Sequence, residues 1–245
     1  MQIAVEGILA HHEIIGKAKK GKILILHGWG RSSHDWNQIA QKLSSQYQVI
    51  LLDLPGFGDS TIPESEVWGI FEYAEIVEKF IKKLGLKKIT LIGHSFGGEI
   101  ALVIAAKNPV YLEKLILVDS AGVDKAGFWT KVKIKIFKIG KIVPLPKQLY
   151  EALVWRLGSK TYASAGKLRT SFKKIENQDV SYLIPSIKTP TLIVWGEKDL
   201  VLSVNWARKM KDLIKNSTLR IVWGVGHHPH LEKPNKFLEI IKEYL

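Results

Sequence analysis

A serine in a glycine-rich turn is the first group of this chain that could carry out covalent chemistry. Ser95 is the central residue of Gly93-His94-Ser95-Phe96-Gly97-Gly98, which matches the pattern G-x-S-x-G. An apolar run at 89–92 precedes this turn, and a helical pattern at 97–107 follows it. A sharp turn between strand and helix projects the serine hydroxyl away from the sheet, and flanking glycines let the two elements pack closely. The pattern therefore predicts a serine nucleophile.

A serine nucleophile requires a base, and the chain contains 8 histidines. The loop that begins at Gly226 follows an apolar strand pattern at 219–223 and carries His227, His228 and His230. A histidine on such a loop could reach back over the strand ends to the serine. We predict His227, directly after Gly226, as the base. His228 and His230 are alternatives that could instead line or brace the site.

A carboxylate must orient the histidine and stabilise its protonated form. Asp199 follows the predicted strand at 191–195 and is the preferred acid, with Glu197 as a less suitable substitute. Asp119, at the end of the predicted strand at 115–118, is a rival whose other interpretation is a turn-forming carboxylate. The preferred set has the chain order serine, acid, histidine.

The transition state of acyl transfer also needs hydrogen-bond donors for a developing oxyanion. The first turn of the helix behind Ser95 offers the unpaired backbone N–H of Phe96 and the positive end of a helix dipole. A second donor is expected from the loop His27-Gly28-Trp29-Gly30, which follows the predicted strand at 23–26. We predict that the backbone N–H groups of Trp29 and Phe96 form the oxyanion hole.

The elements that must hold these residues alternate along the chain. Continuous apolar runs, typical of strands buried on both faces, occur at 23–26, 49–52 and 115–118, and further strand patterns occur at 89–92, 191–195 and 219–223. Helical patterns occur at 34–45, 66–84, 97–107, 204–214 and 234–245. The turns at Gly7 and Gly16 indicate an antiparallel hairpin at a sheet edge. This alternation predicts an α/β fold with a doubly wound, mainly parallel sheet.

An insertion interrupts the alternation and separates two parts of the predicted core, 1–122 and 186–245. The inserted segment, 123–185, has helical patches, and we expect a helical cap over the pocket. Trp129 and Trp155 are its candidate substrate-contacting residues. Its 13 basic and 4 acidic residues give +9 of the chain's net charge of +13. Such a cap could recruit an acidic carrier, rest on an anionic surface, or be a solvated face of a lysine-rich protein.

Composition limits the classes of protein that this chain can represent. There is no cysteine, which excludes a disulfide scaffold, a thiolate metal site and a cysteine nucleophile. Only 5 of the 36 basic residues are arginine, and no nucleic-acid-binding motif is present, so nucleic acid is not an expected partner. We expect a cytoplasmic protein, since we find neither a signal peptide nor an apolar stretch long enough to span a membrane.

Taken together, the motifs resemble those of the α/β-hydrolase superfamily along nearly the whole chain. They are His27 to Gly30, Asp53 to Ser60, Gly93 to Gly98, Gly196 to Asp199 and Gly226 to Pro234, in family order. The resemblance implies the same nucleophile, acid, base and oxyanion roles, and a mainly structural role for Asp53 to Ser60. Within the superfamily the chain is most similar to small carboxylesterases and to carbon–carbon bond hydrolases of aromatic catabolism.

These observations predict a serine hydrolase that cleaves a small-molecule carboxylic ester of small to medium acyl chain through an acyl-enzyme intermediate. No cofactor and no metal are expected. A zinc site at His227, His228 and His230 is improbable because Pro229 interrupts them and partner carboxylates are missing. The alternatives are carbon–carbon hydrolysis of a diketone or dienoate by the same three residues and, in a different class, a non-catalytic ligand receptor.

Overall fold

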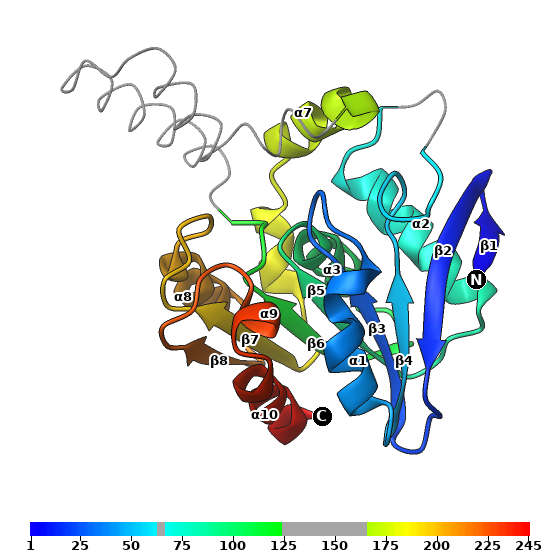
Figure 1. Cartoon of the computed structure of the whole chain (residues 1–245). Helices are drawn as coiled ribbons and strands as arrows, with labels where there is room; N and C mark the ends of the chain where they lie inside the picture. The colour runs from blue at the N-terminus through cyan, green and yellow to red at the C-terminus, as the bar shows by residue number, and fades with distance from the viewer. Residues whose placement is uncertain (63–66, 124–165) are drawn as a thin grey trace, which may run out of the picture.

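The computed structural model describes residues 1–62, 67–123 and 166–245, which are arranged around one eight-stranded sheet (Figure 1). The strands are β1 (Gln2–Val5), β2 (Ile8–Ile15), β3 (Gly21–Leu26), β4 (Tyr47–Leu52), β5 (Ile89–His94), β6 (Leu112–Val118), β7 (Thr191–Gly196) and β8 (Ser217–Val222). Their order is β1-β2-β4-β3-β5-β6-β7-β8. β2 pairs antiparallel with β1 and β4, and every other neighbouring pair is parallel. The predicted mainly parallel sheet with an edge hairpin is confirmed.

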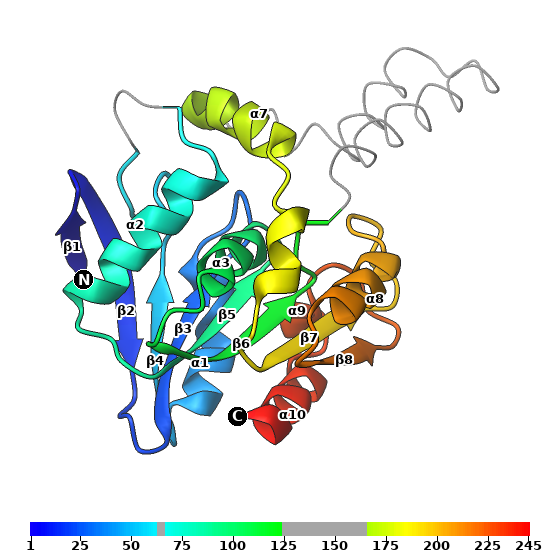
Figure 2. The ribbon, with the colours of Figure 1, turned by 180° about the vertical axis from the view of Figure 1, so that it is seen from behind.

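Helices cover both faces of this sheet, so the core has two halves (Figures 1 and 2). One face carries α2 (Ile70–Lys83), α3 (Phe96–Ala106) and α8 (Val204–Leu213), and the other carries α1 (Asn37–Leu43) and α10 (Pro234–Tyr244). Alternate residues of β3 point into opposite halves of the core: Leu24 and Leu26 lie in the first half, and Ile23 and Ile25 lie in the second. Because both sets are buried, the sequence of β3 from 23 to 26 is a continuous apolar run.

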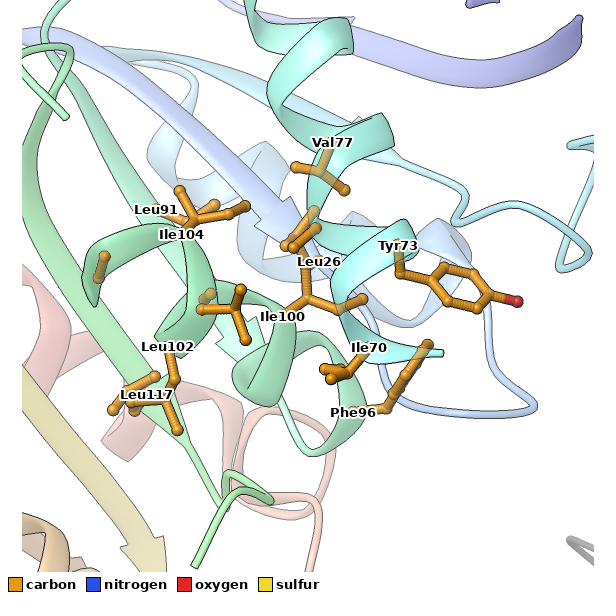
Figure 3. Close-up of a cluster of buried hydrophobic side chains, with 14 of the residues drawn as sticks. Leu26, Ile70, Tyr73, Val77, Leu91, Phe96, Ile100, Leu102, Ile104 and Leu117 are labelled. Atoms are coloured by element: carbon orange, nitrogen blue, oxygen red, sulfur yellow. The ribbon is translucent and has the colours of Figure 1, made fainter. Parts of the chain in front are cut away.

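The helix that follows Ser95 is enclosed by its neighbours. Figure 3 shows side chains of α3 packed among those of the sheet and of α2. Ile100, Leu102 and Ile104 of α3 are all fully buried. Complete burial of such a side chain stabilises the fold by roughly 1.5–3 kcal/mol. This packing fixes the start of α3, and with it the turn that carries Ser95.

Two of the element boundaries that differ from the predicted ones have a clear cause. The helix predicted at 66–84 begins at Ile70, whose N–H donates a hydrogen bond to Gln178 Oε1 at 2.7 Å. Gln178, far along the chain, therefore helps to set the start, together with Glu72, which accepts the Gly69 N–H at 2.8 Å. Trp223 lies outside the last strand, and its side chain is largely exposed. β8 ends at Val222 because its partner β7 ends at the paired Gly196, and no ladder continues beyond that point.

Part of the predicted cap, including Trp129 and Trp155, lies outside the described residues. The boundaries of the cap therefore stay a prediction. The described remainder forms η3 (Gly166–Leu168), α7 (Arg169–Asn177) and η4 (Ser181–Ser186). α7 lies over the end of the molecule toward which the parallel strands run (Figures 1 and 2). None of the described helices has both the length and the apolarity that crossing a membrane requires.

Candidate active site

Ser95 lies in a strained turn between β5 and α3. Its backbone has φ 51° and ψ −112°, a combination that residues with a side chain rarely adopt. The Ser95 N–H donates to the Val118 carbonyl at 3.0 Å, and the Ser95 carbonyl accepts from the Ala121 N–H at 3.1 Å. A methyl group on Gly97 would lie 2.5 Å from the Leu26 carbonyl oxygen, so only glycine lets α3 approach β3 this closely. Strain that is held by neighbouring strands in this way indicates a functional turn.

Ser95, His227 and Asp199 form a continuous row of hydrogen-bonded side chains. His227 Nε2 lies 3.0 Å from Ser95 Oγ, and His227 Nδ1 lies 2.7 Å from Asp199 Oδ2. His227 is on the loop between β8 and α9 (Pro229–Glu232), and Asp199 is on the loop after β7. An Nδ1–H that donates to the carboxylate leaves Nε2 free to accept the serine proton. This arrangement has the geometry of a nucleophile, a base and an orienting acid.

Asp199 is held in place by the loop that carries it. Its Oδ1 accepts hydrogen bonds from the N–H groups of Val201 at 2.7 Å and Leu202 at 2.9 Å. Its side chain has no exposed surface. The carboxylate therefore accepts three hydrogen bonds, the third of them from His227, which suits a charged group in a buried position.

The other two candidate acids occupy different positions. Glu197 accepts a hydrogen bond from the Gly224 N–H at 3.2 Å and so braces the loop after β8. Asp119 is fully buried, and its Oδ1 accepts a hydrogen bond from the Gly196 N–H at 2.9 Å. Among these three carboxylates, Asp199 is the one that is hydrogen-bonded to His227.

The other histidines of the loop lie around His227 rather than against the serine. The ring of His230 stacks on the Trp36 ring, with centroids 4.1 Å apart and planes 2° from parallel. The ring of His228 lies edge-on to that of His227 at 5.0 Å. Among the described histidines, His227 is the one hydrogen-bonded to Ser95 Oγ.

His94 completes this group, although no pattern in the sequence singles it out. It is buried, and its Nε2 donates a hydrogen bond to the His227 carbonyl at 2.8 Å, which ties the base-bearing loop to β5. Burial, reinforced by the neighbouring histidines, lowers the pKa of His94 and His230 well below the usual value. Burial and His227 lower the pKa of His228 to about 4. The three are therefore neutral at pH 7 and place no charge beside the base.

The two predicted oxyanion donors stand free of other partners. Neither the Trp29 N–H nor the Phe96 N–H donates a hydrogen bond to any group in the described part of the chain. A methyl group on Gly28 would lie 3.4 Å from Ser95 Cβ, so the loop after β3 passes directly beside the serine. His27 holds that loop in place through both ring nitrogens. Its Nδ1–H donates a hydrogen bond to the Gly28 carbonyl at 2.8 Å, and its Nε2 accepts one from the N–H of Leu54, on the loop after β4, at 2.9 Å.

An aromatic cluster surrounds Trp29. Its ring lies 4.8 Å from Phe57, 5.2 Å from Phe96 and 4.9 Å from Phe172, measured between centroids. Phe172 comes from α7, within the predicted insertion, and the sequence offered no pattern that would link it to Trp29. Phe57, Phe96 and Phe172 are buried and Trp29 is partly exposed, so the cluster is an apolar region next to the turn that carries Ser95.

The loop 53–60 is organised by its first residue. Asp53 accepts hydrogen bonds from the N–H groups of Ser33 at 2.7 Å and Asp59 at 3.0 Å, and its carboxylate lies 2.9 Å from His11 Nδ1. Burial acts to raise the pKa of Asp53, but the hydrogen bonds from Asp59 and Ser33 outweigh it, so this pKa lies below its usual value. These contacts give the loop a structural role.

Two sets of described side chains have the types and closeness of metal ligands. They are His11 with Asp53 and Asp59, and His227 with Asp119 and Asp199. In each set the histidine nitrogen is already hydrogen-bonded to an aspartate, which is the contact that a metal ion would have to replace.

Comparison with known proteins identifies the family. The sequence model of a family described as alpha/beta hydrolase fold matches residues 22–139 and 154–234. The matched ranges include Ser95, Asp199 and His227. The chain belongs to this family.

Several relatives are lipases or esterases. Lipase 1 of Psychrobacter immobilis is 28% identical over 230 residues, which cover 86% of this chain and 72% of that protein. A putative esterase/lipase of Haemophilus influenzae is 26% identical over 249 residues, which cover 96% and 86%. The crystal structure of a membrane phospholipase A, described as a bacterial virulence factor, superposes with a TM-score of 0.83 at 28% identity, covering 100% of this chain and 84% of that one. The chain is thus an α/β hydrolase with lipase and esterase relatives.

Proposed function

We propose that this protein is a serine hydrolase that cleaves carboxylic esters through an acyl-enzyme intermediate. The observation that carries the proposal is the row of contacts from Ser95 Oγ through His227 to Asp199, at 3.0 and 2.7 Å. The lipase and esterase relatives support an ester as the scissile bond. The apolar cluster around Trp29, beside Ser95, supports an acyl chain of hydrocarbon character, and we propose that this chain is small to medium in length.

In the first half of the reaction the serine is acylated. Ser95 Oγ attacks the ester carbonyl carbon while its proton passes to His227 Nε2. The tetrahedral oxyanion accepts hydrogen bonds from the N–H groups of Trp29 and Phe96. When the carbon–oxygen bond to the alcohol breaks, His227 returns the proton to the departing oxygen.

In the second half water releases the acyl group. His227 takes a proton from the water as its oxygen attacks the acyl carbon, and the same N–H groups stabilise the second oxyanion. The carboxylic acid leaves when the acyl–Ser95 bond breaks and the serine regains its proton. Asp199 keeps the His227 imidazole oriented throughout, and its negative charge stabilises the imidazole when that ring is protonated.

A series of p-nitrophenyl esters of increasing acyl length tests this proposal. We expect the wild type to turn over these esters and Ser95→Ala to lower kcat by about 10⁴-fold or more. The acyl length with the highest kcat/KM then indicates the size of the acyl-binding pocket. A fluorophosphonate probe should form a covalent adduct on Ser95 that mass spectrometry locates, and it should leave Ser95→Ala unlabelled.

The result that contradicts the proposal is a wild type that neither hydrolyses any ester of the series nor reacts with the probe. Hydrolysis of a dienoate in place of esters would instead assign the protein to carbon–carbon bond hydrolysis. Ser95→Cys provides a matched control, because it keeps a nucleophile of similar shape in the same turn.

A further inference from the structure

Asp119 is a buried aspartate that the proposed mechanism does not use. It follows β6 directly, its side chain has no exposure, and its backbone has the uncommon φ of 41°. Its N–H donates to the Val194 carbonyl at 3.0 Å, and its Oδ1 accepts the Gly196 N–H at 2.9 Å. Both contacts are with β7, so Asp119 is fixed to the strand that leads to Asp199.

The carboxyl group of Asp119 lies close to the proposed acid and base. One oxygen each of Asp119 and Asp199 and one ring nitrogen of His227 all lie within 4.8 Å of one another. The second oxygen of Asp119, Oδ2, is buried and has no hydrogen-bond partner in the described part of the chain. A buried carboxylate oxygen without a donor is costly, whereas the same oxygen with a proton is a hydrogen-bond donor itself.

Two carboxyl groups this close inside the protein do not both ionise readily. Asp199 accepts three hydrogen bonds and Asp119 accepts one, so the negative charge is more stable on Asp199. Burial, together with the charges of Asp199 and Glu232, raises the pKa of Asp119 well above its usual value. Among the described residues, the charged or titratable groups that act on Asp119 or lie beside it are these two carboxylates and His227.

We propose that Asp119 is a positioning residue that remains protonated and turns its proton toward Asp199, so that one carboxylate charge, not two, faces His227. This inference rests on the proposed function. A second charge would hold the imidazolium too strongly for it to return its proton to the leaving group. A neutral Asp119 instead steadies the Asp199 carboxylate without adding charge.

The experiment compares Asp119→Asn with Asp119→Ala. The asparagine amide is neutral and retains both a donor and an acceptor, so we expect kcat within about threefold of the wild type and an unchanged acid limb of the pH profile of kcat/KM. The alanine variant loses the donor, so we expect kcat to fall about five- to tenfold with KM little changed. Rescue by the neutral asparagine is the signature of a protonated Asp119.

A second measurement does not depend on activity. Infrared spectra at pH 7 should contain the carbonyl stretch of a protonated carboxylic acid that disappears in Asp119→Asn. The band should persist in Asp53→Asn, because Asp53 is a buried aspartate whose pKa is lowered. An ester-inactive wild type with an intact band would contradict the proposed function alone.

The inference is overturned if Asp119→Asn lowers the apparent pKa of the acid limb or reduces kcat as much as alanine does. Either result would mean that Asp119 contributes a negative charge to His227. A wild type without the infrared band would overturn it as well, and this measurement stands even if the alanine variant fails to fold.

Discussion

His227 and His228 show how neighbouring residues of one type acquire different properties. The His227 ring lies between Ser95 Oγ and the Asp199 carboxylate. His228 has its pKa lowered to about 4, first by burial and then by His227 itself. A base must accept a proton near neutral pH, and a histidine whose pKa is about 4 is a poor acceptor there. Position along the loop therefore separates the proposed base, His227, from a neutral neighbour, His228.

Exchange of each histidine tests this assignment. We expect His227→Ala to lower kcat for a p-nitrophenyl ester by about 10⁴-fold or more, because the serine loses its proton acceptor. His228→Gln should stay within about threefold of the wild type, because a neutral polar side chain replaces a neutral histidine. Steady-state kinetics of the two variants shows which histidine, His227 or His228, acts as the base. The reverse pattern would make His228 the base.

At the scale of the elements, the site depends on how closely α3 approaches β3. The absence of a side chain at Gly97 is what permits this approach. Phe96 begins α3 and Trp29 lies on the loop after β3, so the same approach sets the distance between the two proposed oxyanion donors. The spacing of the catalytic groups is thus a property of helix and strand packing.

Gly97→Ala should therefore damage activity more than its effect on stability alone would suggest. An added methyl group forces α3 away from the Leu26 carbonyl oxygen, at a cost of about 1–3 kcal/mol in the free energy of unfolding. We expect kcat to fall at least about tenfold, because small displacements of reacting groups are costly. Chemical denaturation and ester kinetics on the same preparation measure the two effects.

Gly85→Ala is the matched control. Gly85 follows α2 with φ 58°, and an added methyl group would meet no atom within 4 Å. It should destabilise the protein by about 1–2 kcal/mol through backbone strain alone and leave kcat unchanged. If both variants lose activity in proportion to stability, the close approach at Gly97 has no particular importance for the site.

The central strands β3 to β7 could be predicted from the sequence because residues on both of their faces are buried, so they are nearly continuous apolar runs. β8 is only half-buried, and Arg220 interrupts its apolar residues. The sequence favours Asp199 over Asp119, but the local pattern does not show which carboxylate reaches His227, since both follow buried strands and β6 and β7 are neighbours. Asp199 comes after Gly196 and two further residues, and this extra length carries its carboxylate to His227. The start of α2 was also beyond local patterns, because Gln178 contributes to it from 108 residues away.

At the scale of the whole molecule, burial has left several histidines neutral. Burial lowers the pKa of His27, His94 and His230 below the usual value near 6.5, and lowers that of His228 to about 4. When the chain unfolds, these rings reach water and regain ordinary pKa values. Below about pH 6.5 the unfolded chain then binds more protons than the native protein, so acid favours unfolding.

The free energy of unfolding should therefore fall as the pH decreases from 7 to 5. Each such histidine contributes a slope of up to about 1.4 kcal/mol per pH unit. Asp119 acts in the opposite direction over this range, because its raised pKa keeps a proton on the native protein. It is one group against five, since burial also lowers the pKa of His12. Urea denaturation at several pH values measures the slope.

His230→Gln should reduce the pH dependence of the free energy of unfolding by about the contribution of one histidine. His34→Gln should leave this dependence unchanged, because His34 is exposed. Stability that is independent of pH between 5 and 7 would show that the buried rings are protonated in the native protein. A slope that His34→Gln reduces as much as His230→Gln would place its origin at the surface.

The strand order also has a consequence for synthesis. From β5 onward each new strand joins the sheet beside the one made just before it, so the sheet can widen in the order in which the ribosome delivers the strands. A nascent chain that ends after Asp199 contains the serine and the acid but not His227. The proposed catalytic capacity would therefore arise only when the loop after β8 has joined a sheet that is otherwise assembled.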